Sequence, residues 1–136
     1  MNQKFQKILA LLVEQETVEV EYSPDLLAQY QNDIVKLGKK YPQDVWEVLR
    51  NGTENEFSAL INCVAEIGGE FDDENNSREI MYIAKQRLLN AQNHEDFMAT
   101  IKAGFGNLFA RFWNETEPAK SAVKTRMYSQ AIQPPV

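Results

Sequence analysis

The chain has 136 residues, of which 43% are hydrophobic and 25% charged, and its formal net charge is −6. This length is typical of one domain, and the composition is that of a globular protein rather than a disordered or fibrous one. No apolar run approaches the roughly 18 residues that a membrane-spanning helix needs, so we expect a protein that does not span a membrane.

A first helix is predicted near the N-terminus, where apolar residues recur at the spacing of one helix face. These residues are Phe5, Ile8, Leu9 and Leu12. Residues 17–22 then alternate polar and apolar side chains, which favours a short extended segment, with continuation of the first helix as the alternative. A single extended segment leaves its backbone edges unpaired, so it would need a partner such as a second chain.

The next two helices have recognisable beginnings and ends. Ser23 is a favourable N-cap, and Pro24 fits the first helical position, so a second helix begins there. We expect Gly38 to end this helix, since glycine commonly follows a helix C-terminus. A shorter helix is predicted after Pro42, ending at Gly52.

A capping box then predicts the start of a fourth helix. Thr53 and Glu56 have the spacing at which each side chain can accept a hydrogen bond from the other residue's backbone. Helical apolar periodicity continues to position 67, and the pair Gly68-Gly69 is expected to end the helix.

The remaining segments predict two further helices and a tail. A polar loop over residues 70–76 leads to a helix whose apolar positions include Ile80 and Leu88. Asn93 is expected to cap a helix with a wide apolar face that extends to Trp113. The glycines around Phe105 within that segment indicate close packing or a kink rather than a phosphate-binding loop.

These elements predict an all-α fold, an irregular single-domain bundle of about five to six helices, with a short extended segment near residues 17–22. The predicted organisation is a helical domain over residues 1–117 and a C-terminal basic tail or peripheral helix over residues 118–136. The tail contains three basic and no acidic residues, so the remainder of the chain carries −9.

The residues that usually perform catalysis or bind zinc are scarce. His94 is the single histidine and Cys63 the single cysteine, and both occupy ordinary positions of predicted helices. We expect His94 to be a solvated surface residue and Cys63 a buried, inert thiol. The sequence therefore predicts no metal, no cofactor and no enzyme.

The candidate binding residues are four carboxylates in the predicted loop. They are Glu70, Asp72, Asp73 and Glu74. Clustered oxygen ligands can attract calcium, but the segment lacks the glycine and the twelve-position spacing of an EF-hand loop. Exposed between two helices, the four carboxylates form a candidate surface for a basic protein partner, with a solvated loop that has no partner as the alternative.

Charge and composition favour a protein-binding function. Residues 1–117 are strongly acidic and therefore repel the phosphate backbone of a nucleic acid. We do not expect a nucleic-acid partner. We expect a non-enzymatic protein-binding or inhibitory module that engages a basic partner. Bacterial immunity proteins, which neutralise basic toxin enzymes, have this general size and charge.

Two other functions remain as alternatives: a structural subunit of a homo-oligomer or larger assembly, and an enzyme whose site is assembled from scattered residues. A single cysteine and the lack of a leader pattern predict a cytoplasmic protein.

Overall fold

The computed structural model describes residues 1–16 and 23–115, and every element within them is helical. The described part contains eight α-helices and two 3-10 helices, which confirms the all-α prediction and its irregular bundle. The chain divides into two compact units, Met1–Asp73 (unit 1) and Glu74–Val136 (unit 2). The predicted extended segment and the predicted boundary between residues 117 and 118 lie outside the described residues.

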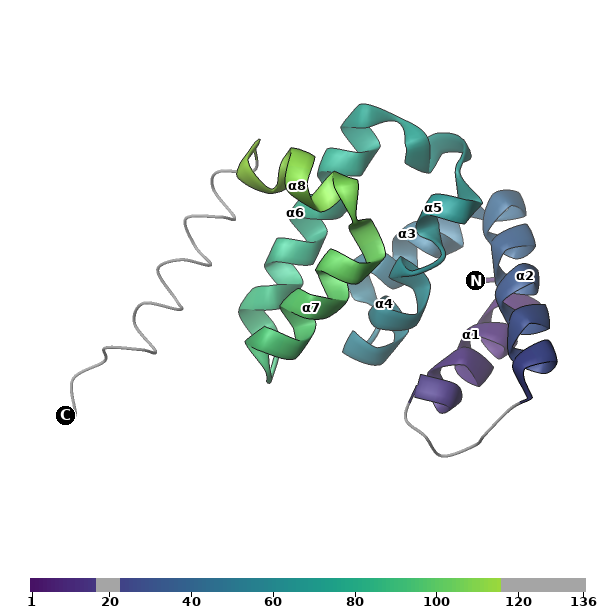
Figure 1. The fold of residues 1–136 in the computed structure, drawn as a ribbon. Helices are drawn as coiled ribbons and strands as arrows, with labels where there is room; N and C mark the ends of the chain where they lie inside the picture. Colours follow the sequence, from purple (N-terminus) through teal and green to yellow (C-terminus); the bar gives the residue numbers. More distant parts are fainter. Residues whose placement is uncertain (17–22, 116–136) are drawn as a thin grey trace. The chain divides into compact units, whose positions relative to one another are not determined.

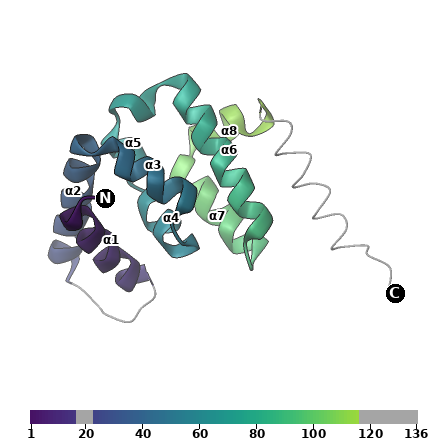
Figure 2. The same cartoon turned by 180° about the vertical axis from the view of Figure 1, so that it is seen from behind.

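The described part of unit 1 contains five α-helices and one 3-10 helix (Figure 1). They are α1 (Gln3–Glu16), α2 (Pro24–Lys40), α3 (Pro42–Asn51), α4 (Glu54–Ile61), α5 (Val64–Ile67) and η1 (Gly69–Asp72). Helix α1 packs against α2 and α4, while α3 packs against α4 and α2. Figures 1 and 2 show α1 and α2 side by side from opposite directions. The apolar face predicted for α1 is buried, including Phe5 and Leu9.

The capping hydrogen bonds predicted at the starts of α2 and α4 are present. Ser23 Oγ accepts a hydrogen bond from the backbone N–H of Leu26 at 3.2 Å, and Pro24 occupies the first turn of α2. Thr53 Oγ1 accepts from Glu56 N–H at 3.1 Å, and Glu56 Oε1 accepts from Thr53 N–H at 2.8 Å. These bonds satisfy backbone donors that lack a partner within the helix.

One predicted helix end and one predicted continuous helix in unit 1 were wrong, whereas the helix end predicted at Gly68 is confirmed. Gly38 does not end α2 but lies buried inside it, where an added Cβ atom would come within 2.6 Å of Ile67 Cδ1. The helix predicted up to position 67 divides instead after Ile61. Cys63 N–H bonds the carbonyl of Leu60, three residues earlier, which tightens the chain before α5 begins.

The described part of unit 2 contains three α-helices and one 3-10 helix. They are α6 (Glu74–Asn90), α7 (His94–Phe105), α8 (Asn107–Phe112) and η2 (Trp113–Glu115). Helices α6 and α7 lie side by side and antiparallel in Figures 1 and 2, and α8 packs against both. The apolar side chains between these helices are buried, including Phe97 and Ile101.

The predicted cap of α7 is confirmed, but its predicted length is not. Asn93 Oδ1 accepts a hydrogen bond from Asp96 N–H at 3.1 Å. The helix expected to reach Trp113 is divided at Gly106, which has a φ of +48° and separates α7 from α8. That conformation favours glycine, which explains why the chain changes direction there.

Candidate functional site

Three of the four candidate carboxylates lie on helical turns rather than in the predicted loop, and Asp73 lies between two helices. Glu70 and Asp72 belong to η1, Asp73 follows it, and Glu74 begins α6. The first three belong to unit 1 and Glu74 to unit 2. All four are exposed. The loop expected over residues 70–76 is therefore shorter than predicted, because η1 and the first turn of α6 take up most of it.

A hollow of about 500 Å³ in unit 1 collects two of the predicted carboxylates and one that was not predicted. Its lining comes from the end of α2, the start of α3, and the chain from Ala65 to Asp72. Glu66, Glu70 and Asp72 contribute acidic side chains, and Lys39 is the basic residue of this lining. Asp73 is not part of it. We call this feature the acidic hollow.

The side chain of Glu70 is held in place by α3. Trp46 Nε1 donates a hydrogen bond to Glu70 Oε2 at 2.8 Å. The indole ring in turn lies 5.1 Å from the ring of Phe71, and the Arg50 guanidinium lies 4.9 Å from the indole centroid. Phe71 is buried, so this contact anchors η1 to α3 next to the hollow.

Two glycines bring Glu66 and Asp72 to the same hollow. Gly68 and Gly69 have φ values of +62° and +58°, which turn the chain sharply between α5 and η1. A Cβ atom on Gly68 would lie 3.1 Å from Asp72 Oδ2, so the Asp72 carboxylate lies close to this backbone. The glycine pair was predicted as a helix end; it also forms one wall of the hollow.

Glu74 is engaged by basic side chains of unit 2. Its Oε1 atom lies 3.1 Å from Arg78 Nη2 and 3.5 Å from Arg111 Nη2. The first contact is also a hydrogen bond. Two guanidinium groups beside one carboxylate offset its charge locally, so Glu74 differs from the carboxylates of the hollow. The spacing between Glu74 and Arg78, four residues on a helix, was a readable signal of the first contact.

A second hollow of unit 1, of about 310 Å³, is lined by residues of α1, α3 and α4. Its two carboxylates have local partners. Glu47 Oε1 accepts a hydrogen bond from the Asn51 side chain at 3.2 Å, and Glu56 closes the capping box with Thr53. These bonds give both carboxylates a role within their own helices.

The other two residues considered from the sequence, Cys63 and His94, do not belong to the lining of the acidic hollow. Cys63 is buried, as predicted, and its Sγ lies 3.9 Å from the carbonyl oxygen of Ala59. His94, expected to be solvated, is half-buried at the start of α7. Within residues 1–16 and 23–115, no group of three or more His, Cys, Asp or Glu side chains could hold a metal ion. In the same residues no helix is long and apolar enough to cross a membrane.

Comparison of the chain with protein-family models, with curated proteins and with solved structures gives no match.

Proposed function

We propose that the chain is a non-enzymatic protein-binding or inhibitory module, of the immunity type, that holds a basic segment of a partner protein on the acidic hollow of unit 1. The observation that supports this proposal most directly is the lining of that hollow. Glu66, Glu70 and Asp72 contribute three carboxylates against the single ammonium group of Lys39. A concave, negatively charged surface favours lysine or arginine side chains from a partner.

The charge distribution of the chain supports the same proposal. Residues 1–73 contain 14 acidic and six basic residues, a net charge of −8, whereas residues 74–136 contain six acidic and eight basic residues, a net charge of +2. The field of unit 1 therefore attracts a basic protein from a distance, and the hollow offers the short-range contacts.

The hydrogen bond between Trp46 and Glu70 also fits a binding role. A carboxylate whose position is held before the partner arrives loses less side-chain entropy on binding. The proposal includes a cytoplasmic location, since a chain with a single cysteine forms no internal disulfide and suits a reducing compartment.

Affinity capture from a lysate of the source organism, read by mass spectrometry, tests the proposal. The test variant is Glu66→Gln/Glu70→Gln/Asp72→Asn, which removes three charges from the hollow. The matched control is Asp25→Asn/Glu54→Gln/Glu95→Gln, which removes three charges from exposed first turns of other helices.

The expected result is a stoichiometric basic partner that the wild type and the control retain and the hollow variant loses. Equal retention by all three proteins would contradict a role for the hollow. The charges removed in the control each contribute about 0.3–1 kcal/mol to their helices, so thermal unfolding must confirm that both variants remain folded.

A further inference from the structure

We propose that Asn51 is a site of covalent modification by spontaneous deamidation, and that the last turn of α3 slows this reaction in the folded protein. Asn51 is followed by Gly52, and this is the one Asn-Gly pair of the sequence. Asn51 is exposed at the end of α3, where water and hydroxide reach its side chain. The pair lines the second hollow of unit 1, and neither residue lines the acidic hollow.

The reaction needs only the chain itself and water, and asparagine is among the residues that heat degrades. The backbone nitrogen of Gly52 gives its proton to a base in solution and attacks Cγ of Asn51. A bond forms between this nitrogen and Cγ, the bond between Cγ and Nδ2 breaks, and Nδ2 takes a proton from solution and leaves as ammonia. Water then opens the five-membered succinimide at either carbonyl, which gives aspartate or isoaspartate at position 51. No atom is oxidised or reduced.

The fold requires glycine at the position where glycine makes this reaction fastest. A Cβ atom on Gly52 would lie 2.6 Å from the carbonyl oxygen of Val48 and 3.0 Å from Val48 Cγ1. Any larger residue there would have to displace backbone atoms of α3. The missing Cβ atom also leaves the attacking nitrogen unobstructed and its backbone free to adopt the geometry of ring closure. The close approach to Val48 therefore keeps a reactive pair at the end of α3.

Hydrogen bonds within the last turn of α3 oppose the reaction. The Gly52 N–H group donates to the carbonyl oxygen of Val48 at 2.9 Å, so the proton that must leave is bound by a backbone acceptor. Asn51 Nδ2 donates to Glu47 Oε1 at 3.2 Å, which binds the leaving group to the preceding turn. Both bonds must break before the ring can close. Helix ends open locally with small free energies, so the reaction proceeds from this open state without global unfolding.

The product destabilises the turn that protects the asparagine. Aspartate at position 51 lacks the amide donor, and its charge lies four residues from Glu47 on the same helix. The C-terminal end of a helix also disfavours a negative charge. Isoaspartate adds one carbon atom to the main chain, so the Gly52 N–H group loses its register with Val48. Modification therefore adds a charge to the hollow that Glu56 also lines, and it loosens the connection between α3 and α4.

Peptide mapping by mass spectrometry tests the proposal on the full chain, incubated in mildly alkaline buffer with and without guanidinium chloride. Asn51 is expected to convert at least about tenfold more slowly in the folded protein, which corresponds to an opening free energy of about 1.4 kcal/mol or more. A peptide of residues 47–56 in the same two buffers corrects for any direct effect of the denaturant. Equal rates in the folded and unfolded chain would overturn the protection by α3. Absence of conversion in the unfolded chain would overturn the site itself.

Two variants separate the chemistry from the protection. Gly52→Ala is measured in denaturant, where its stability has no influence, and should slow conversion at least about fivefold because a Cβ atom obstructs ring closure. Glu47→Ala removes the acceptor of the Asn51 amide and should speed conversion of the folded protein by about two- to tenfold, the effect of one hydrogen bond.

Glu95→Ala is the matched control for Glu47→Ala, because it removes an exposed glutamate from α7 and should leave the rate at Asn51 unchanged. Equal rates for the two variants would overturn the role of the hydrogen bond to Glu47. A Gly52→Ala chain that converts as fast as the wild type in denaturant would overturn the attack by the nitrogen of residue 52.

The effect on stability is measured with two substitutions of the asparagine. Asn51→Asp reproduces the aspartate product, whereas Asn51→Gln keeps an amide that forms no five-membered ring with the next nitrogen. The unfolding equilibrium constant of Asn51→Asp is expected to be at least about twofold higher than that of Asn51→Gln in denaturant titrations. Equal constants would overturn the proposed destabilisation of α3 by its own modification.

Discussion

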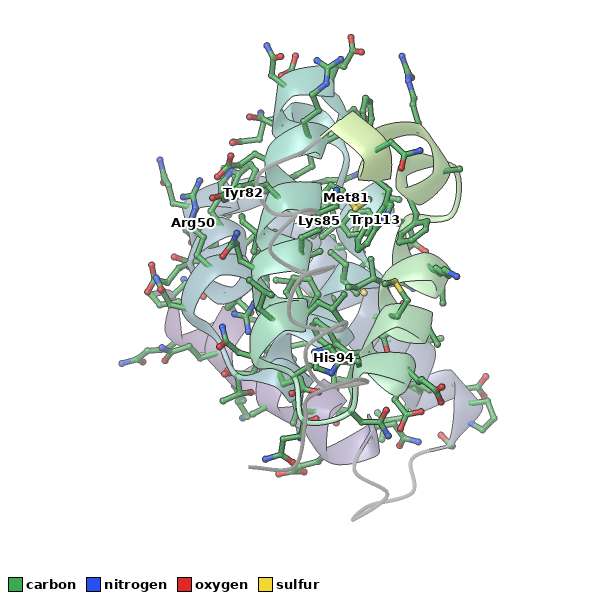
Figure 3. The ribbon with its side chains drawn as sticks, turned by 90° about the vertical axis from the view of Figure 1, so that its left-hand side faces the viewer. Arg50, Met81, Tyr82, Lys85, His94 and Trp113 are labelled. Atoms are coloured by element: carbon green, nitrogen blue, oxygen red, sulfur yellow. The ribbon has the colours of Figure 1, made fainter. Side chains whose placement is uncertain are left out.

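Lys85 of α6 donates a hydrogen bond from its ammonium group to the carbonyl oxygen of Trp113 in η2, and its Nζ lies 4.4 Å from the centroid of the Trp113 indole. Figure 3 shows the two side chains together beside Met81. Lys85 is fully buried, which is uncommon for a lysine. The ammonium group thus satisfies a backbone acceptor of η2 from α6 and at the same time contacts an aromatic ring.

Replacing this lysine is expected to destabilise the protein. Lys85→Ala leaves both a cavity and an unsatisfied carbonyl, so the free energy of unfolding should fall by about 2–4 kcal/mol. Lys85→Met keeps most of the volume and removes the donor, and should cost about 1–3 kcal/mol. Urea denaturation measures both values, and an alanine variant within about 0.5 kcal/mol of the wild type would show that the contact contributes little.

The capping box of α4 provides a second test of stability. Thr53→Ala removes the acceptor of the Glu56 N–H group and should lower the free energy of unfolding by about 1 kcal/mol. Thr53→Ser keeps a hydroxyl oxygen and is the matched control, expected to stay close to the wild type. Thermal unfolding distinguishes the two, and an alanine variant as stable as the serine variant would mean that the cap adds no stability.

The helix starts were readable from the sequence because each depends on residues close together in the chain. Ser23, Thr53 and Asn93 all accept the backbone hydrogen bonds predicted for them. The helix ends were less predictable. Glycine at position 38 is typical of a helix end, but here it is required because Ile67 of another helix approaches it closely. The periodicity of the sequence carries no information about that contact.

The candidate site shows the same division between local and long-range information. The acidic character around Glu70 and Asp72 follows from the sequence, whereas the Trp46–Glu70 hydrogen bond joins residues 24 positions apart. Lys85 could have been recognised: it follows Met81 by four residues and precedes Leu88 by three, which places it on the buried face of α6.

Close packing at Gly38 predicts that a single methyl group is destabilising. A Cβ atom there would lie 2.6 Å from Ile67 Cδ1 and 3.2 Å from Val45 Cγ2. Gly38→Ala should therefore lower the free energy of unfolding by about 1–3 kcal/mol, although alanine favours helix elsewhere. Urea denaturation measures the change, and a stabilised Gly38→Ala variant would contradict the tight contact.

The double variant Gly38→Ala/Ile67→Val tests the cause of that destabilisation. Valine lacks the Cδ1 atom, and Ile67→Val alone should cost about 0.5–1.5 kcal/mol. If the clash with Cδ1 is responsible, the double variant should be more stable than the sum of the single changes by at least about 0.5 kcal/mol. Strict additivity would place the clash elsewhere, with the backbone or with Val45.

Asp72 and Glu74 are separated by one residue, yet their surroundings predict opposite behaviour in binding. Asp72 lines the acidic hollow, whereas Glu74 is engaged by Arg78 and Arg111. With an oligolysine peptide as the probe, Asp72→Asn should slow association about two- to tenfold, because the hollow loses one of its three carboxylates. Glu74→Gln should change the association rate by less than about twofold, because two arginines already offset its charge.

Stopped-flow fluorescence or surface plasmon resonance measures these rates at fixed, low ionic strength, where charge effects are least screened. Both substitutions remove one negative charge, so each is the control for the other. Equal slowing by the two would mean that the peptide responds only to net charge. A larger effect of Glu74→Gln would indicate that the peptide binds at the start of α6 and not at the hollow.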